Sequence, residues 1–131
     1  RYELAAHVLA QTVAGLGTED AQRALRDTAR EWGRRLAHEP SMSTRQTVPL
    51  KRAAHALEAC GFEPRRAPDG EVLLGNCPFD ALRAESCELI CGMNLALIEG
   101  LLSGLELNEV QAKLAPRPGM CCVALRARGG D

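Results

Sequence analysis

"CPFDALRAESCELICGMNLALIEGLLSG", residues 77–104, is the stretch that decides the fold. Its second half is apolar on nearly every side and stops at Gly104, a pattern typical of a helix buried in the centre of a domain. After it, a polar stretch to about Leu114 is predicted to be helical. The turn "APRPGM" then leads into "CCVALRA", residues 121–127, which we expect to form the last strand.

The residues before this stretch predict three helices and a hairpin. Apolar residues recur at helical spacing in two runs over residues 1–38, which are separated at Gly17, with Trp32 on the apolar face of the second run. A polar loop is expected at 39–47, and a third helix should end at Gly61. A Pro-Asp-Gly turn then separates two short extended segments.

This order of elements predicts an α+β fold, in which N-terminal helices precede a small antiparallel sheet covered by helices. A length of 131 residues suits one domain with a single core. We therefore expect residues 1–131 to form one domain, with a helical part at 1–46 and a cysteine-containing α+β part at 47–131.

Composition argues against several classes of protein. The formal net charge is −1, so the chain lacks the excess of basic residues that a dedicated nucleic-acid-binding face needs. No apolar run approaches membrane-spanning length and no secretory signal is visible, so we expect a cytoplasmic protein without a membrane partner. The three histidines, His7, His38 and His55, lie outside any catalytic motif, and we do not expect an enzyme.

Six cysteines in a chain without secretory features favour metal binding or redox sensing over a disulfide framework. Cys77 precedes a proline and is expected at a helix N-cap, where the helix dipole lowers the pKa of a thiol. Cys87 and Cys91 are four residues apart and share one helix face. Because side chains alternate along a strand, we expect Cys121 to point inward and Cys122 to point to the other face, where its role as a ligand, a redox partner of Cys121 or a bystander stays open.

One ion can bind these thiols only if the helix at 78–91 is broken, because a straight helix would put Cys77 about 20 Å from Cys91. We expect the break at Ala84, Glu85 and Ser86, with Ser86 as the N-cap of a second helix. The predicted metal ligands are Cys77, Cys87, Cys91 and Cys121. The alternative, that the cysteines are small buried hydrophobic residues, stays open, and it is the expected state of Cys60.

Four short motifs resemble the C-terminal domain of bacterial winged-helix transcriptional regulators that are grouped with the ArsR and DeoR families. They are "GFEP" at 61–64, "NCPF" at 76–79, "LICGMN" at 89–94 and "PGMCCVAL" at 118–125. These regulators include the iron–sulfur-binding repressors of cluster-assembly genes, and the resemblance covers roughly residues 48–128. It implies a sensory and dimerisation domain that forms a homodimer and contacts DNA through a winged helix upstream.

In those repressors four cysteines hold an iron–sulfur cluster, and the resemblance matches Cys77, Cys91 and Cys121 to three of them. The first of the family's four falls near residue 63, where this chain has no cysteine, and Cys87 is the expected replacement. Thiolates suit zinc as well as iron–sulfur clusters, so the predicted cofactor is one of these two.

The order of elements also resembles the vinyl-reductase-type domain, which encloses apolar ligands. An apolar ligand-binding regulatory module with structural or redox-active cysteines is therefore the alternative function. Small residues recur every four positions in the buried helix, at Gly92, Ala96, Gly100 and Gly104. They favour close packing of the helix on its own sheet, with a dimer contact or a ligand tunnel as the other interpretations.

Overall fold

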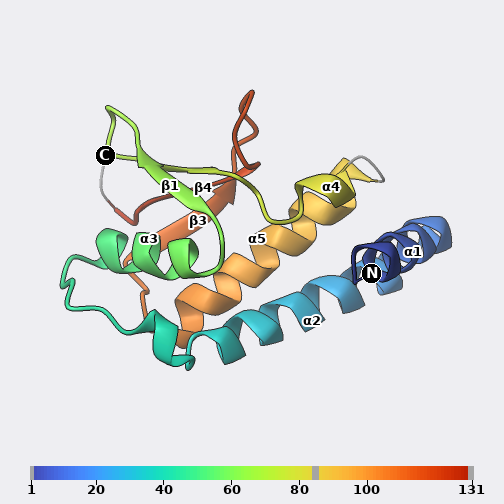
Figure 1. Ribbon diagram of the computed structural model, residues 1–131, viewed down its shortest axis with the longest axis horizontal. Coiled ribbons are helices and arrows are strands. Elements are labelled where there is room, and N and C mark those ends of the chain that lie inside the picture. The colour runs from blue at the N-terminus through green and yellow to red at the C-terminus, as the bar shows by residue number, and fades with distance from the viewer. Residues whose placement is uncertain (1, 84–85, 130–131) are drawn as a thin grey trace.

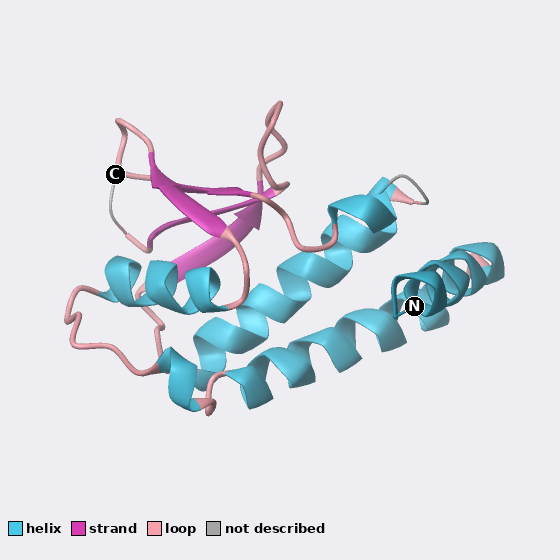
Figure 2. Cartoon of the chain, viewed as in Figure 1, coloured by secondary structure: helices cyan, strands magenta, loops and turns pink. Residues whose placement is uncertain are grey.

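The computed structural model describes residues 2–83 and 86–129, and a long central helix and an antiparallel sheet form its middle (Figure 1). The helices are α1 (Tyr2–Leu16), α2 (Glu19–Leu36), the 3-10 helix η1 (Pro40–Met42), α3 (Pro49–Ala59), α4 (Asp80–Arg83) and α5 (Cys87–Gly104). The strands are β1 (Glu63–Arg66), β2 (Val72–Gly75), β3 (Val110–Leu114) and β4 (Val123–Ala127). Helices thus precede and cover a small antiparallel sheet, which confirms the predicted α+β class (Figure 2).

The strands lie in the order β1-β2-β4-β3, and every neighbouring pair is antiparallel. β1 and β2 form the predicted hairpin, whose turn contains Gly70 at a φ of 88°. β1 is an edge strand, which is the place in a sheet where a proline such as Pro64 is tolerated. Because β4 lies beside β2, the chain that enters β4 is close to the chain that leaves β2.

β3 replaces the helix that was predicted after α5, so that prediction is wrong. Glu106 adopts a φ of 59° and ends α5, and the Leu107 N–H donates to the Leu102 carbonyl at 2.9 Å, as in a Schellman motif. The following residues alternate, with Val110 and Ala112 buried on the face that β3 turns to the core. The period of two residues suits a strand beside β4.

The predicted break in the 77–104 stretch is confirmed, since α4 ends at Arg83 and α5 begins at Cys87. Ser86 occupies the N-cap of α5, as expected, but its side chain makes no capping hydrogen bond. Ala84 and Glu85, the other two residues of the predicted break, lie outside the described residues.

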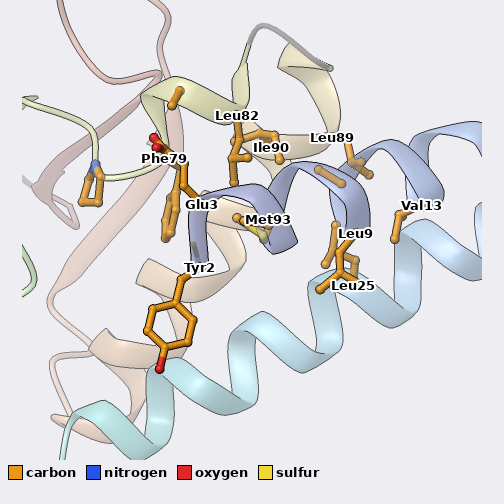
Figure 3. Close-up of a pocket in the computed structure, with 14 residues that line it drawn as sticks. Tyr2, Glu3, Leu9, Val13, Leu25, Phe79, Leu82, Leu89, Ile90 and Met93 are labelled. Carbon is orange, nitrogen blue, oxygen red and sulfur yellow. The ribbon is translucent and has the colours of Figure 1, made fainter.

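Several large apolar side chains of α1 and α2 are exposed and do not lie in the core. Leu9 and Val13 of α1 face Leu25 of α2 across a shallow groove (Figure 3). Trp32, expected in the core, is 53% exposed, and the guanidinium of Arg35 lies 4.7 Å from the centre of its ring. α2 instead buries small residues, because its backbone approaches α5 closely.

Glycines make that close approach possible. A Cβ on Gly100 would overlap the Arg30 carbonyl oxygen, and one on Gly33 would overlap the Leu97 carbonyl oxygen. A Cβ on Gly104 would lie 2.6 Å from the Cβ of Ala37. The small-residue stripe of α5 therefore packs on α2, and the expected packing on its own sheet is wrong for these glycines.

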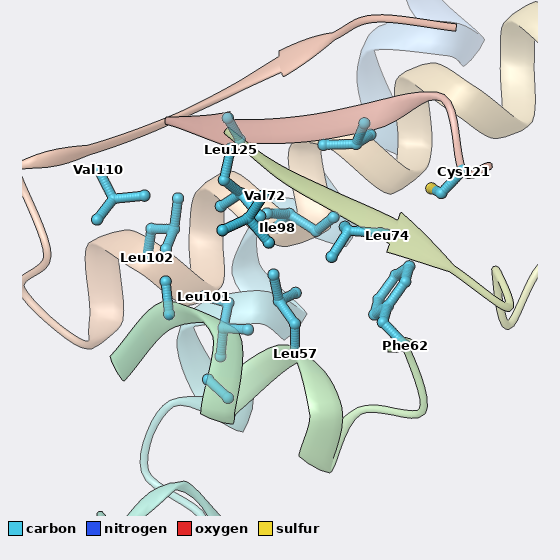
Figure 4. Close-up of a cluster of buried hydrophobic side chains, with 14 of the residues drawn as sticks. Leu57, Phe62, Val72, Leu74, Ile98, Leu101, Leu102, Val110, Cys121 and Leu125 are labelled. Atoms are coloured by element: carbon cyan, nitrogen blue, oxygen red, sulfur yellow. The ribbon is translucent and has the colours of Figure 1, made fainter. Parts of the chain in front are cut away.

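The apolar core fills the space between the sheet and the two helices α3 and α5. Leu57 of α3 and Ile98 and Leu101 of α5 point toward Leu74 and Leu125 of the sheet (Figure 4). All five side chains are at most 2% exposed. α5 is thus held between the sheet on one side and α2 on the other.

The length and apolar composition of α5 would also allow it to span a membrane, in contrast to the prediction that no apolar run approaches that length. Half of its residues are buried inside the protein, as in the core helix of a water-soluble domain.

The contact between α2 and α5 predicts opposite effects for two glycine-to-alanine changes in one helix. Gly100→Ala forces the Arg30 backbone away and should lower the free energy of unfolding by about 1–3 kcal/mol. Gly92→Ala meets nothing closer than the Arg26 Cδ at 3.9 Å and should raise it by up to ~1 kcal/mol through helix propensity. Urea unfolding measures both, and equal effects of the two changes would contradict the packing.

Candidate functional site

Three separate segments bring five of the six cysteines to one end of α5. Cys77 lies in the turn after β2, and Cys87 and Cys91 lie in the first two turns of α5. Cys121 and Cys122 lie just before β4. The Cys121 N–H donates to the Leu74 carbonyl at 2.7 Å, which fixes this last segment beside the end of β2. The fold thus assembles residues that are far apart in sequence.

The five thiols are neighbours in a chain. The Sγ atoms of Cys87 and Cys91 are 3.8 Å apart. Cys91 and Cys122 lie close enough to shift each other's pKa, and Cys122 also interacts with its neighbour Cys121. Cys121 and Cys77 shift each other's pKa at the other end of the chain. All six cysteines are free thiols, and Cys87 is the exposed member of the cluster.

Cys121 and Cys122 are both buried, at 3% and 2% exposure. The prediction that Cys122 points away from the site is therefore wrong, although Cys121 does point inward as expected. The alternation argument does not apply, because β4 begins only at Val123 and both cysteines precede it in a bend. Cys122 belongs to the cluster.

Asn94 is a part of the site that the sequence analysis missed. It is completely buried, and its Nδ2 lies 3.0 Å from the Cys121 Sγ and 3.9 Å from the Cys77 Sγ. Its Oδ1 has no hydrogen-bond partner among the described residues. A lone amide in the apolar run "GMNLAL", one helical turn after Cys91, was the available signal.

Hydrogen bonds lower the pKa of Cys121 to about 6. The main donor is the Cys77 thiol, and the N–H of Val123 and the Asn94 amide add to it, while burial acts in the opposite direction. The same bond raises the pKa of Cys77, since that thiol must keep its proton to donate it, and burial raises it further. Cys121 is therefore the thiolate of the pair at neutral pH.

The predicted lowering of the pKa of Cys77 by a helix N-terminus is thus wrong. α4 begins at Asp80, three residues later, and has only four residues. The N–H of Phe79 does bond to the Cys77 sulfur and lowers its pKa, but this effect is smaller than those of Cys121 and of burial.

Cys91 and Cys122 also stay protonated at neutral pH. Burial raises the pKa of Cys122, and its hydrogen bond with Cys91 acts in the same direction. Burial is also the main reason why the pKa of Cys91 is raised. The guanidinium of Arg83 brings a positive charge close to Cys87 at the start of α5. Its Nη1 also donates to Asp80 at 3.1 Å.

A polar cleft of about 440 Å³ reaches the cluster, and Cys77 and Cys121 form part of its wall. Arg83 and Arg117 also line it. Arg117 donates to Glu71 at 2.6 Å, and Lys113 lies 3.7 Å from the same carboxylate, which is 2% exposed. These ion pairs hold the loop that carries Cys121 against the β1–β2 hairpin.

The structure therefore brings the predicted ligands Cys77, Cys87, Cys91 and Cys121 to one region and adds Cys122. Cys60 lies apart, at the end of α3, and burial raises its pKa. Within residues 2–83 and 86–129, no group of three or more cysteine, histidine or acidic side chains is arranged to hold a metal ion. In this arrangement the free thiols contact one another, and Cys121 accepts a hydrogen bond from Asn94.

No family model matches the chain, and the comparisons with curated proteins and with solved structures found no significant match. The resemblance to winged-helix regulators stays a prediction from the four motifs. The function of the cysteine cluster is therefore inferred from the distances, burial and pKa values of its thiols.

Stability should depend on pH through these thiols. In the reduced, metal-free protein, folded Cys121 is ionised above about pH 6, whereas the unfolded chain keeps that proton up to about 9.0. The free energy of unfolding is therefore expected to rise from pH 6 to 9. Above pH 9 it should fall, because the unfolded chain releases protons that Cys77 and Cys122 keep when folded.

Urea unfolding across this pH range measures the effect. Cys121→Ser should abolish the rise between pH 6 and 9, and Cys60→Ser, outside the cluster, should keep it. A flat profile for the unmodified chain would contradict the thiolate at Cys121.

Proposed function

We propose that this chain is the sensory domain of a bacterial transcriptional regulator and that its clustered thiols bind zinc or an iron–sulfur cluster. The observation that carries the proposal is the continuous chain of five thiols, which three distant segments contribute at one end of α5. Free thiols of this kind suit a reducing cytoplasm, where clustered cysteines bind metal or respond to redox state.

The donor atoms fit thiolate coordination in two respects. In a tetrahedral zinc site with Zn–S bonds of about 2.3 Å, two sulfurs lie roughly 3.8 Å apart, and the Sγ atoms of Cys87 and Cys91 have that separation. Buried N–H groups also point at the sulfurs, from Asn94 and from the backbone of Phe79 and Val123. Such N–H···S bonds stabilise thiolates and tune bound metals.

Five thiols exceed the four ligands of a tetrahedral ion. Cys77, Cys87, Cys91 and Cys121 are the predicted ligands, and the position of Cys122 between Cys91 and Cys121 makes it an equal candidate. The orphaned Oδ1 of Asn94 marks the polar environment as incomplete without a further group. A bound ion or cluster would link the three segments. This link would be present or absent according to the metal supply or the redox state.

The presence or absence of the bound metal would change the relative positions of the segments that carry the thiols. Cys77 belongs to the turn between β2 and α4, and Cys91 belongs to the helix that packs on α2. A link between these segments restrains α4 relative to α5, and its loss releases them. DNA contact is assigned to a winged-helix domain outside this chain, since the net charge of −1 leaves no basic face for phosphate.

The test is anaerobic purification with iron and zinc analysis and an absorption spectrum on the same sample. Near-stoichiometric metal is expected in the unmodified chain and in the control Cys60→Ser. Cys91→Ser and Cys121→Ser should each lower the metal content, because loss of even an outer-shell partner lowers the affinity for metal at least about tenfold. Visible charge-transfer bands identify a cluster, and zinc without colour identifies a single ion.

A folded, metal-free chain whose stability is the same in both variants would reject the metal-binding function.

The second candidate function, an apolar ligand-binding module, is favoured by a groove of about 530 Å³ between α1, α4 and α5. Leu9, Phe79, Leu82, Ile90 and Met93 point into it (Figure 3). Its volume lies in the range of small-molecule sites, and its lining is almost wholly apolar. The apolar lining favours an uncharged ligand, and Glu3 at the wall would repel an anionic one.

A neutral fluorescent probe, N-phenyl-1-naphthylamine, tests this candidate. If the groove is a ligand site, the probe should brighten with the unmodified chain and bind at least about tenfold more weakly to Ala81→Trp, which fills the groove from α4. Ala24→Trp, at an exposed position on α2, is the control. Equal binding by all three would show that the groove does not hold the probe.

A further inference from the structure

α1 exposes most of its large apolar side chains. Among the described residues eight large hydrophobic side chains are exposed, and five of them lie on α1. They are Tyr2, Leu4, Val8, Leu9 and Leu16, with exposures from 56% to 94%. The helix fully buries only Ala10. An isolated helix of 15 residues is marginally stable in water, so α1 needs more cover than the domain gives it.

α1 has two apolar faces. The inner face, with Ala6, Ala10 and Val13, lies on the groove beside α4 and α5. The outer face presents small residues at spacings of three, four and three, namely Ala5, Val8, Thr12 and Gly15, as along the seam of a helix pair. The Thr12 hydroxyl already donates to the Val8 carbonyl at 2.8 Å, so this seam offers no polar atom that requires water.

The outer face carries no charge that would choose a charged partner. Residues 4–16 contain no acidic or basic residue apart from His7. An identical face therefore approaches without repulsion, and the small residues of the seam let two helix backbones come close. An uncharged face with small residues therefore suits association of α1 with α1 of a second copy.

The available area also suits a copy of the same helix. α1 is about 22 Å long at 1.5 Å per residue, and the side chains outside the groove, Leu4, Val8 and Leu16 with the small residues of the seam, offer roughly 500 Å². Two facing copies would bury about 1,000 Å², which is the lower limit for a specific interface.

We propose that the outer face of α1 is a homodimer interface, in which α1 packs on α1 of a second copy about a twofold axis. The proposal gives a surface to the predicted homodimer and does not depend on metal binding by the thiols. The twofold pairing supplies the missing cover and holds each α1 against its own domain.

Sedimentation equilibrium of the reduced chain tests the interface, with and without metal. The unmodified chain should have about twice the monomer mass of 14.1 kDa. Val8→Glu places a charge in the seam and should shift the mass to that of the monomer. Val48→Glu is the matched control, because Val48 is also exposed, at 46%, but lies at the start of α3; it should stay dimeric.

Hydrogen exchange gives a second readout that needs no variant. The amides of α1 should exchange more slowly as the concentration of the unmodified chain rises, and those of α3 should not change. A monomeric unmodified chain, or a Val8→Glu chain that stays dimeric, would overturn the proposal. A monomer that still binds N-phenyl-1-naphthylamine would also overturn it and would favour the apolar ligand instead. Metal content is measured separately, so failure of the interface leaves the thiol site intact.

Discussion

The contact between α2 and α5 is the constraint on which the arrangement of the molecule depends. The helices touch through backbone at Gly33 and Gly100, where a side chain on either glycine would overlap a carbonyl oxygen. Because α2 closes one side of α5, the sheet must cover the other, and the core forms between them (Figure 4). The first turns of α5 then lie beside the ends of β2 and β4, where the thiols gather.

The thiol cluster contributes chemistry at a cost in stability. A buried carbonyl without a partner among the described residues, such as the Asn94 Oδ1, costs about 1–3 kcal/mol, and Leu at this position would be cheaper to bury. Cys121 and Cys122 likewise fill buried positions that aliphatic side chains can fill. The apolar contacts of Leu57, Ile98 and Leu125 supply the stability that this polar end lacks. Local rules are typically broken in this way at functional sites.

Local signals carried the predictions that succeeded. The Pro-Asp-Gly turn closes the hairpin between β1 and β2 and needs no distant partner. β3 and Trp32 failed because tertiary contacts decide them: β3 exists beside β4, and α2 turns its small residues to α5. The structure brings Cys77, Cys87, Cys91 and Cys121 to one end of α5, but the place of Cys122 beside them was not predicted, because β4 begins two residues later than expected.

α4 physically connects the two candidate functions of the molecule. Cys77 lies three residues before this short helix, while Phe79 and Leu82 form part of the groove under α1 (Figure 3). A link between Cys77 and the other thiols would hold α4 in one position, and α1 rests on α4. If α1 follows α4 from one position to another, the strength of the pairing of α1 with a second copy would differ between the two states of the thiols, although the dimer forms in both. Thermodynamic reciprocity requires the converse, so that pairing would also change the affinity of the thiols for metal.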